Sequence, residues 1–256
     1  MNYVDFGKTA SDYGKHRAGF PAEFFWELSR LGIGMPGQRV VDLGTGTGTI
    51  ARQLAAQGCA VTGIDRSEDM LQKARALAKE ASVSAEFRLA TAEDTGLATA
   101  AYDVVCAGQC WHWFDRARAA AECYRLLRPG GVLVIAHFDW IPLSGNVAET
   151  TEKLIEAHNP EWKLGGGLGI HPRFIPRVSE AGFQGLRTFS FDLDVPYTHE
   201  AWRGRIRASA GIGPVLSPEA VARFDAELAA LLAADFPGDP LAVPHRVWAM
   251  IAYKSI

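Results

Sequence analysis

The sequence predicts an α/β fold built on a parallel sheet with helices on both faces. Three observations support this prediction: short apolar runs alternate with helical segments between Gln38 and Phe138, a glycine-rich turn follows the first apolar run, and two further strand-like runs lie near the end of the chain. Near-continuous apolar runs are typical of strands buried on both faces. Right-handed connections between parallel strands bring the loops that follow them to one edge of the sheet, where ligands bind.

The alternation is regular through the first half of the chain. Gly58 ends the first helix as a C′ residue, and Ser67 begins the second as an N-cap with acidic residues behind it. Pro129-Gly130-Gly131 stops a later helix and sets the start of the next strand. The expected strands are Arg39–Leu43, Cys59–Ile64, Ala85–Leu89, Tyr102–Ala107 and Val132–Phe138, and the expected helices are Thr49–Gln57, Ser67–Glu80 and Ala117–Leu127.

The pattern changes after Phe138. A long insertion with the glycine tract Gly165–Gly169 follows at the ligand-binding edge and predicts a lid, with a plain surface loop as the alternative. Residues 185–195 alternate like a half-buried strand, and the last strand is expected to pair with it in the antiparallel sense. The later elements are expected at Val147–His158, Gly185–Val195, His199–Ser209, Pro218–Ala234 and His245–Lys254.

Composition restricts the classes of partner. The 256 residues are 48% hydrophobic and 21% charged, with a net charge of −3 and no long basic run, which argues against nucleic acid as a partner. No apolar run approaches the ~20 residues of a membrane span, and no signal peptide is evident. Four cysteines lack C-x-x-C or metal-ligand spacing, so no metal is expected and a reducing, cytoplasmic location is favoured.

The most specific motif is Val40-Val41-Asp42-Leu43-Gly44-Thr45-Gly46-Thr47-Gly48. Glycines are needed where the backbone adopts positive φ or lets a ligand approach closely, and the helix that follows presents free N–H groups. Asp65 lies 21 residues after Gly44, at the end of the next strand, where a carboxylate can accept both hydroxyls of a ribose. The motif predicts a nucleoside-cofactor site, with a glycine turn that serves only helix packing as the structural alternative.

The spacing Gly-x-Gly-x-Gly differs from the Gly-x-Gly-x-x-Gly of dinucleotide-binding turns, and Asp42 before it suits an ammonium group better than a pyrophosphate. Together with Asp65, this pattern resembles the class I methyltransferases that use S-adenosylmethionine. The resemblance implies a Rossmann-like sheet of seven mostly parallel strands with an antiparallel last strand and a helical lid. It also implies that the cofactor is bound by Asp42, Gly44, Thr45, Gly46, Gly48, Asp65, Arg66, Met70, Ala92, Glu93 and Gln109.

Two further segments extend the resemblance to the type 11 group, which includes ubiquinone-biosynthesis and trans-aconitate methyltransferases. They are Gln109-Cys110-Trp111-His112-Trp113-Phe114-Asp115 and Arg125-Leu126-Leu127-Arg128-Pro129-Gly130-Gly131. After the third strand, Glu93 or Asp94 is expected to accept the adenine amino group, with a solvated turn as the alternative. Tyr13 and Arg17 resemble the N-terminal element of the group, where Arg17 would pair with the cofactor carboxylate and Tyr13 would line the substrate mouth. An exposed arginine on a capping helix is the alternative for Arg17.

Methyl transfer from a sulfonium needs a general base only if the acceptor arrives protonated. His112 is the first candidate and His137 the second, with a role in the pocket wall as the alternative for a histidine between two tryptophans. Trp111, Trp113 and His137 are expected to line the substrate site. Arg203 and Arg207 share a helix face and are candidates for an anionic acceptor, with a solvated face as the alternative.

The sequence thus predicts a methyltransferase that acts on a small molecule by in-line displacement. A nicotinamide-dependent oxidoreductase and a catalytically silent cofactor-binding regulator are the alternatives. A homodimer is one of the oligomeric states left open. A single domain over 1–256 is expected, with a helical cap (1–37), a cofactor-binding core (38–138), lid elements (139–180 and 196–240) and closing strands (181–195 and 245–254).

Overall fold

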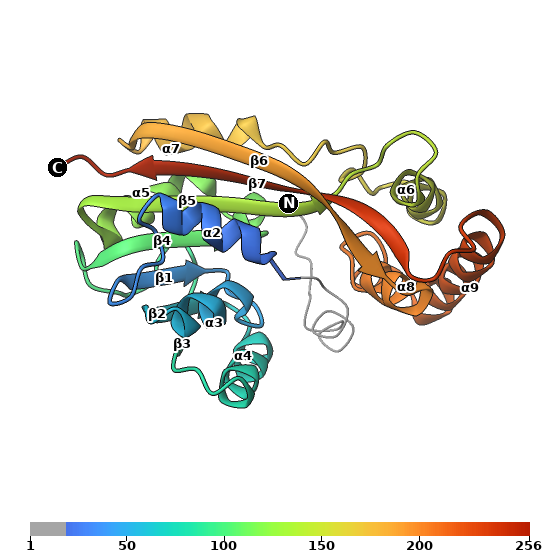
Figure 1. Ribbon diagram of the computed structural model, residues 1–256, viewed down its shortest axis with the longest axis horizontal. Helices are drawn as coiled ribbons and strands as arrows, with labels where there is room; N and C mark the ends of the chain where they lie inside the picture. Colours follow the sequence, from blue (N-terminus) through green and yellow to red (C-terminus); the bar gives the residue numbers. More distant parts are fainter. Residues whose placement is uncertain (1–18) are drawn as a thin grey trace. The chain divides into compact units, whose positions relative to one another are not determined.

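A seven-stranded sheet with the order β3-β2-β1-β4-β5-β7-β6 organises the protein (Figure 1). The computed structural model describes residues 19–256, so Tyr13 and Arg17 lie outside the described residues. The strands are β1 (Arg39–Leu43), β2 (Ala60–Asp65), β3 (Glu86–Leu89), β4 (Tyr102–Gly108), β5 (Leu127–Trp140), β6 (Gln184–Tyr197) and β7 (Leu241–Tyr253).

The first five strands pair in the parallel sense, which confirms the predicted fold class. Val40 in β1 lies opposite Val61 in β2 and Val104 in β4, and all three side chains are buried. This register places the carboxyl ends of β1, β2 and β4 at one edge of the sheet, where the loops that follow them lie together.

Strand β5 is longer at both ends than the sequence indicates. Its first residues, up to Gly131, continue the strand because Gly130 N–H donates to Lys254 O at 3.0 Å and Lys254 N–H donates to Gly131 O at 2.9 Å. At its other end, Ile141 N–H donates to Pro244 O at 2.8 Å. The start of β5 therefore pairs with the end of β7 and the end of β5 with the start of β7, so β7 is antiparallel, as predicted.

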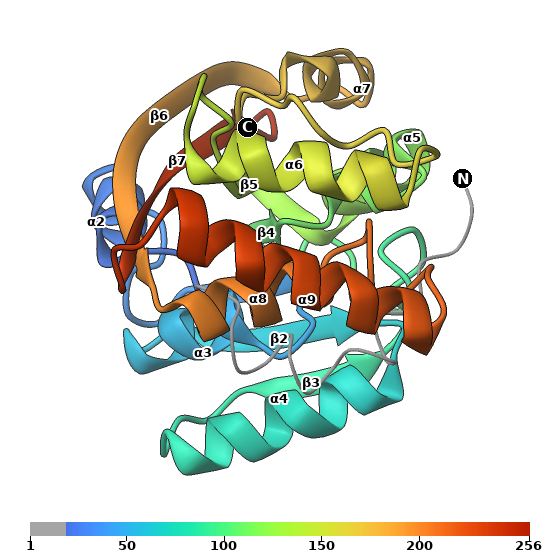
Figure 2. The same cartoon turned by 90° about the vertical axis from the view of Figure 1, so that its right-hand side faces the viewer.

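The chain divides into two compact units, which we call the sheet unit (residues 19–138, 171–190 and 247–256) and the helical unit (residues 139–170 and 191–246). In the sheet unit, α2 and α3 lie on one face of the sheet and α5 and α7 on the other (Figure 2). Its helices are α2 (Ala22–Arg30), α3 (Thr49–Ala56), α4 (Glu68–Glu80), α5 (Arg116–Leu126) and α7 (Ile175–Glu180), with single 3-10 turns at Trp111–Trp113 and Pro172–Phe174.

The helical unit has an apolar core of its own. Helix α9 (Pro218–Asp235) contacts both α6 (Val147–His158) and α8 (His199–Arg207). Each of the three helices has an N-cap residue whose side chain accepts a hydrogen bond from a backbone N–H of the first turn. These residues are Asn146, Thr198 and Ser217. Trp202 and Phe224 are fully buried within the core of this unit. No helix in residues 19–256 combines the length and apolar character needed to cross a membrane.

Candidate active site

The glycine loop between β1 and α3 adopts the backbone that its sequence predicts. Gly44, Gly46 and Gly48 have φ angles of 61°, 55° and 79°, in the left-handed region where side chains are strained. A Cβ on Gly44 would lie 2.8 Å from Cys110 Sγ, and one on Gly48 would lie 3.2 Å from the Phe87 ring. Among residues 19–256, a Cβ on Gly46 would meet no atom within 4 Å beyond its chain neighbours. The first and third glycines therefore allow close packing, whereas Gly46 borders open space that a ligand can occupy.

Asp42 lies in β1, just before this loop, and is buried, with only 2% of its surface exposed. Its carboxylate accepts hydrogen bonds from Thr45 Oγ1 at 2.6 Å and from Cys106 Sγ at 3.4 Å. Burial raises the pKa of Asp42 to about 6, against the smaller opposing effect of these two bonds. A nearby cation would favour the ionised form, so the site is suited to an ammonium group.

Asp65 at the end of β2 is held in a defined orientation by two backbone groups. Its Oδ2 accepts a bond from Gly46 N–H at 2.8 Å, and its Oδ1 accepts one from Ser67 N–H at 2.9 Å. Each carboxylate oxygen has a second lone pair, so both can still accept a hydroxyl from a ligand. The loop and the acid therefore form one hydrogen-bonded unit, although 19 positions separate Gly46 from Asp65.

Four further predicted cofactor residues lie in the same sheet unit. Met70 is buried in the first turn of α4, where its N–H donates to Ser67 Oγ, while Arg66 is exposed. Ala92 is buried, and Glu93 Oε1 accepts a bond from Asp115 N–H at 2.8 Å. Glu93 therefore joins the turn after β3 to the start of α5, at the residue that caps this helix.

Gln109 follows β4 with a φ of 63°, unusual for a residue with a side chain. Its Nε2 donates to Phe138 O, and its backbone N–H donates to Ala136 O at 2.8 Å. Trp111 after it is fully buried, in edge-on contact with Phe114. Trp111 therefore packs in the core of the sheet unit, while His112 and Trp113 beside it are partly exposed.

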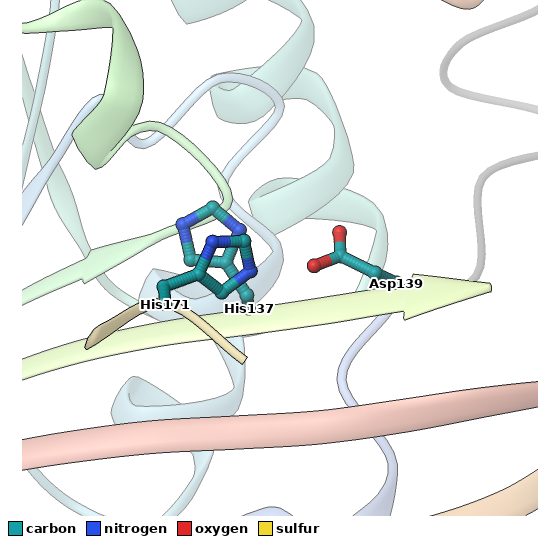
Figure 3. Close-up of side chains that lie close together, drawn as sticks. All are labelled: His137, Asp139 and His171. Carbon is teal, nitrogen blue, oxygen red and sulfur yellow. The ribbon is translucent and has the colours of Figure 1, made fainter. Parts of the chain in front are cut away.

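Two of the predicted histidines lie in one aromatic cluster. The His112 ring is 5.3 Å from the His137 ring, measured between centroids. His137, near the end of β5, is only 3.9 Å from the ring of His171, and Figure 3 shows these two rings against each other. His171 stacks on Phe174 at 5.2 Å and meets Trp248 edge-on. Sequence reasoning missed His171, because no local pattern connects it with residues 34 positions earlier.

The helical unit contains the two arginines that were predicted to bind an anion. Arg203 and Arg207 share one face of α8, as their spacing indicates, and both pair with Asp225 of α9. Glu200 adds a third charge, at 3.4 Å from Arg203 and 3.1 Å from Arg207. Although burial opposes it, hydrogen bonds from both arginines lower the pKa of Asp225. These guanidinium groups therefore already have carboxylate partners within the unit.

Comparisons with known proteins place these features in context. A family model described as a methyltransferase domain matches residues 41–135. A ubiquinone biosynthesis O-methyltransferase of Xanthomonas campestris is 30% identical over 182 residues, which make up 70% of this chain and 73% of that protein. An uncharacterized methyltransferase of Mycobacterium tuberculosis is 36% identical over 131 residues, 51% of this chain and 50% of that protein. The chain thus spans about half the length of these mycobacterial relatives.

Solved structures share the fold. A Haemonchus contortus phosphoethanolamine N-methyltransferase, in complex with phosphomonomethylethanolamine and S-adenosylhomocysteine, matches with a TM-score of 0.61 and 20% identity. The match covers 100% of this chain and 61% of that one. At this level of identity the similarity concerns the fold alone.

Proposed function

Since the chain belongs to the type 11 group of class I S-adenosylmethionine-dependent methyltransferases, we propose that it transfers the methyl group of this cofactor to a small-molecule acceptor by in-line displacement. The observation that carries the proposal is the unit formed by Gly46 and Asp65. Among the described residues, no side chain or neighbouring segment fills the space beside Gly46. Two backbone N–H groups orient the Asp65 carboxylate, and each of its oxygens can still accept a further hydrogen bond.

The residues of the sheet unit fit the cofactor group by group. Asp65 would accept the ribose hydroxyls. Asp42 would face the ammonium group, since none of the groups in residues 19–256 that shift the pKa of its buried carboxyl is a cation. Met70 and Ala92 would give the adenine an apolar contact, and Glu93 would lie at its edge. The conformation of the glycine loop would be maintained by Gly44, Thr45 and Gly48. Gln109 would border the cofactor site from the end of β4.

The cofactor supplies a methyl group that is already activated on a sulfonium. The protein therefore has to bring the acceptor into line and exclude water, rather than activate the donor. His112 is the candidate that would accept the proton of a hydroxyl acceptor, because its ring is partly exposed. His137 is 1% exposed, and its ring would instead orient the His112 ring by packing against it. Trp113 contacts the His112 ring at 4.5 Å and would line the acceptor site.

Transfer of a labelled methyl group tests the proposal. The full chain is incubated with S-adenosylmethionine labelled at the methyl carbon and with phenols, carboxylates and quinone precursors in separate reactions. We expect label in at least one acceptor, with S-adenosylhomocysteine as the second product. Release of the second product without a labelled acceptor, or no turnover in any reaction, would contradict the proposal.

The role of His112 has its own readout. For a phenol acceptor, His112→Ala should lower the turnover rate by about 10²–10⁴-fold and leave the affinity for S-adenosylhomocysteine unchanged. For a carboxylate acceptor, which arrives ionised, the same change should have little effect on turnover. The substitution therefore also reports the chemical class of the acceptor.

The compartment and the oligomeric state complete the proposal. The four cysteines are buried and form no disulfide, which supports a reducing compartment such as the cytoplasm. Sedimentation of the full chain would distinguish a monomer from the homodimer left open by the sequence.

A further inference from the structure

Two histidine rings and a carboxylate converge near the end of β5. His137 and Asp139 lie two positions apart in this strand, which runs without a break to Trp140. Because side chains alternate between the two faces of a strand, both point to the same face. His171 precedes the 3-10 turn at Pro172–Phe174 and lies against the His137 ring, with 3.9 Å between the ring centroids. Strand geometry and a ring contact within the sheet unit therefore define this cluster.

The polar atoms of this cluster are close enough to share one metal ion. One ring nitrogen from each histidine and one carboxylate oxygen of Asp139 lie within 4.8 Å of one another. Figure 3 shows the carboxylate turned toward the two rings. Around a tetrahedral zinc ion, whose bonds to nitrogen and oxygen are about 2.0–2.2 Å long, two ligand atoms are about 3.4 Å apart. Movements of about 1 Å, which side-chain rotation supplies, would close the three ligands around such an ion.

Aromatic neighbours in the sheet unit fix the orientation of both rings. His171 stacks on Phe174 with an interplanar angle of 4°, and it meets Trp248 edge-on. Phe174 also contacts the His137 ring, at 5.4 Å between centroids. His137 is buried, whereas Asp139 and His171 are partly exposed, so an ion has a route from solvent. The ligands are therefore held in place on one side and accessible on the other.

The types of ligand atom select the class of ion. Two imidazoles and one carboxylate are typical of sites for zinc and ferrous iron, whereas Mg²⁺ and Ca²⁺ prefer oxygen ligands. Cysteine spacing in the sequence predicts no metal, but this cluster contains no thiol, and only the fold assembles it. Asp139 also acts through its charge on Arg205 in the helical unit. The carboxylate is therefore shared with a cation, and the two histidines should contribute most of the affinity.

We propose that His137, His171 and Asp139 bind one divalent transition-metal ion such as Zn²⁺. Three protein ligands leave at least one coordination position for water or for a ligand from solution. The His112 ring lies 5.3 Å from the His137 ring, which puts the ion beside the histidine proposed as the base. The inference goes beyond the proposed methyl transfer and does not depend on it, because metal binding is measured directly.

Titration of the full, untagged chain with Co²⁺, after a chelator has removed any bound metal, tests the site. Co²⁺ adopts the coordination of Zn²⁺ and, unlike Zn²⁺, absorbs visible light. We expect one equivalent to bind, with the visible absorption of a four- or five-coordinate ion and without the near-ultraviolet band of a cobalt–thiolate bond. Addition of Zn²⁺ should remove the absorption, because both ions would occupy the same ligands.

Two substitutions in the cluster and one outside it assign the ligands. His171→Phe keeps a ring against Phe174 and removes the nitrogen ligands. It should weaken Co²⁺ binding by more than about 100-fold, because even a residue that only supports a ligand is worth about 10–100-fold. Asp139→Asn keeps the shape and removes the charge, and it should weaken binding by about tenfold. His158→Phe is the matched control and should leave binding unchanged, since His158 lies 3.0 Å from Glu227 as a single histidine–carboxylate pair.

Three results would overturn the proposal: no binding near one equivalent, a cobalt–thiolate band, or equal Co²⁺ affinity in wild type and His171→Phe. An equal loss of affinity in His158→Phe would also contradict it, because the loss would then not be specific to the cluster. Circular dichroism shows whether each variant folds. If His171→Phe does not fold, Asp139→Asn decides the question, and unchanged Co²⁺ affinity in that variant would overturn the assignment.

Discussion

Replacement of Asp42 by asparagine should make the free protein more stable at neutral pH. Burial raises the pKa of this carboxyl from 3.8 to about 6, so the folded state holds its proton more tightly than the unfolded state does. Between these two pKa values the unfolded chain has lost the proton and the folded chain has not. Stability therefore falls as pH rises through this window, and the whole penalty is present above about pH 6.

The size of the penalty follows from the shift. A difference of about 2.2 pKa units corresponds to about 3 kcal/mol at 1.36 kcal/mol per unit, which we take as an upper limit. Asparagine has nearly the same shape and no charge, and its Oδ1 can still accept the Thr45 hydroxyl. The variant should thus gain about 1–3 kcal/mol at pH 7.5 and nearly nothing at pH 4, where Asp42 is protonated in the folded wild type.

Thermal unfolding of wild-type and Asp42→Asn protein at pH 4 and pH 7.5 measures this effect. One kcal/mol shifts the midpoint of a protein of this size by about 2–4 °C, so the change is well within reach of the assay. Asp194→Asn, an exposed acid on β6, is the control and should shift neither midpoint. An Asp42→Asn variant that is less stable than wild type at pH 7.5, or equally affected at both pH values, would refute the electrostatic reasoning.

The same substitution should weaken the binding of the cofactor. Loss of one partner of a buried charge pair costs about 2–5 kcal/mol, so S-adenosylhomocysteine should bind at least about 30-fold more weakly to Asp42→Asn. A variant that is more stable and binds less well would identify Asp42 as a charge kept for the ligand, at the expense of the free protein.

Three further substitutions test the glycine loop and the contacts of α5. Gly44→Ala should unfold the loop, because its Cβ would lie 2.8 Å from Cys110 Sγ. Gly46→Ala should cost only about 1 kcal/mol of backbone strain and still abolish S-adenosylhomocysteine binding. Equal stability of the two variants in thermal unfolding would contradict this difference. Glu122→Ala should lower the free energy of unfolding by about 1–3 kcal/mol, because Glu122 accepts two bonds from Thr95, at 2.6 and 3.0 Å, and two from Arg125. Urea unfolding at pH 7 measures it, and a loss below about 0.5 kcal/mol, which is typical of surface positions, would show that these bonds do not matter.

The parts of the fold predicted from the sequence are those with local causes. The glycine loop needs positive φ at Gly44, Gly46 and Gly48, and only glycine provides it without strain, so the motif and the structure agree. The start of β5 was placed too late because Pro129-Gly130-Gly131 reads locally as a turn. In the structure Gly130 and Gly131 pair with Lys254, more than 120 positions away, and no local pattern contains that information.

The candidate site shows the same division between local and distant causes. Spacing placed Arg203 and Arg207 on one face of α8, but the acid that pairs with both, Asp225, comes from α9. Arg205, which the spacing sets apart, lies over the ring of Trp140, with its Cζ 4.9 Å from the ring centre. His171 joins His137 only through the fold. The local motifs therefore predict the cofactor, whereas the partners of these arginines and histidines come from distant segments of the chain.

The central claim is that the Gly46–Asp65 unit binds S-adenosylmethionine, and isothermal titration of the full chain with S-adenosylhomocysteine tests it most directly. We expect saturable binding to wild type, loss of binding in Asp65→Ala, and unchanged binding in the Asp69→Ala control. NAD should not bind to any of the three proteins. Binding of NAD without binding of S-adenosylhomocysteine, or equal S-adenosylhomocysteine affinity in wild type and Asp65→Ala, would contradict the claim.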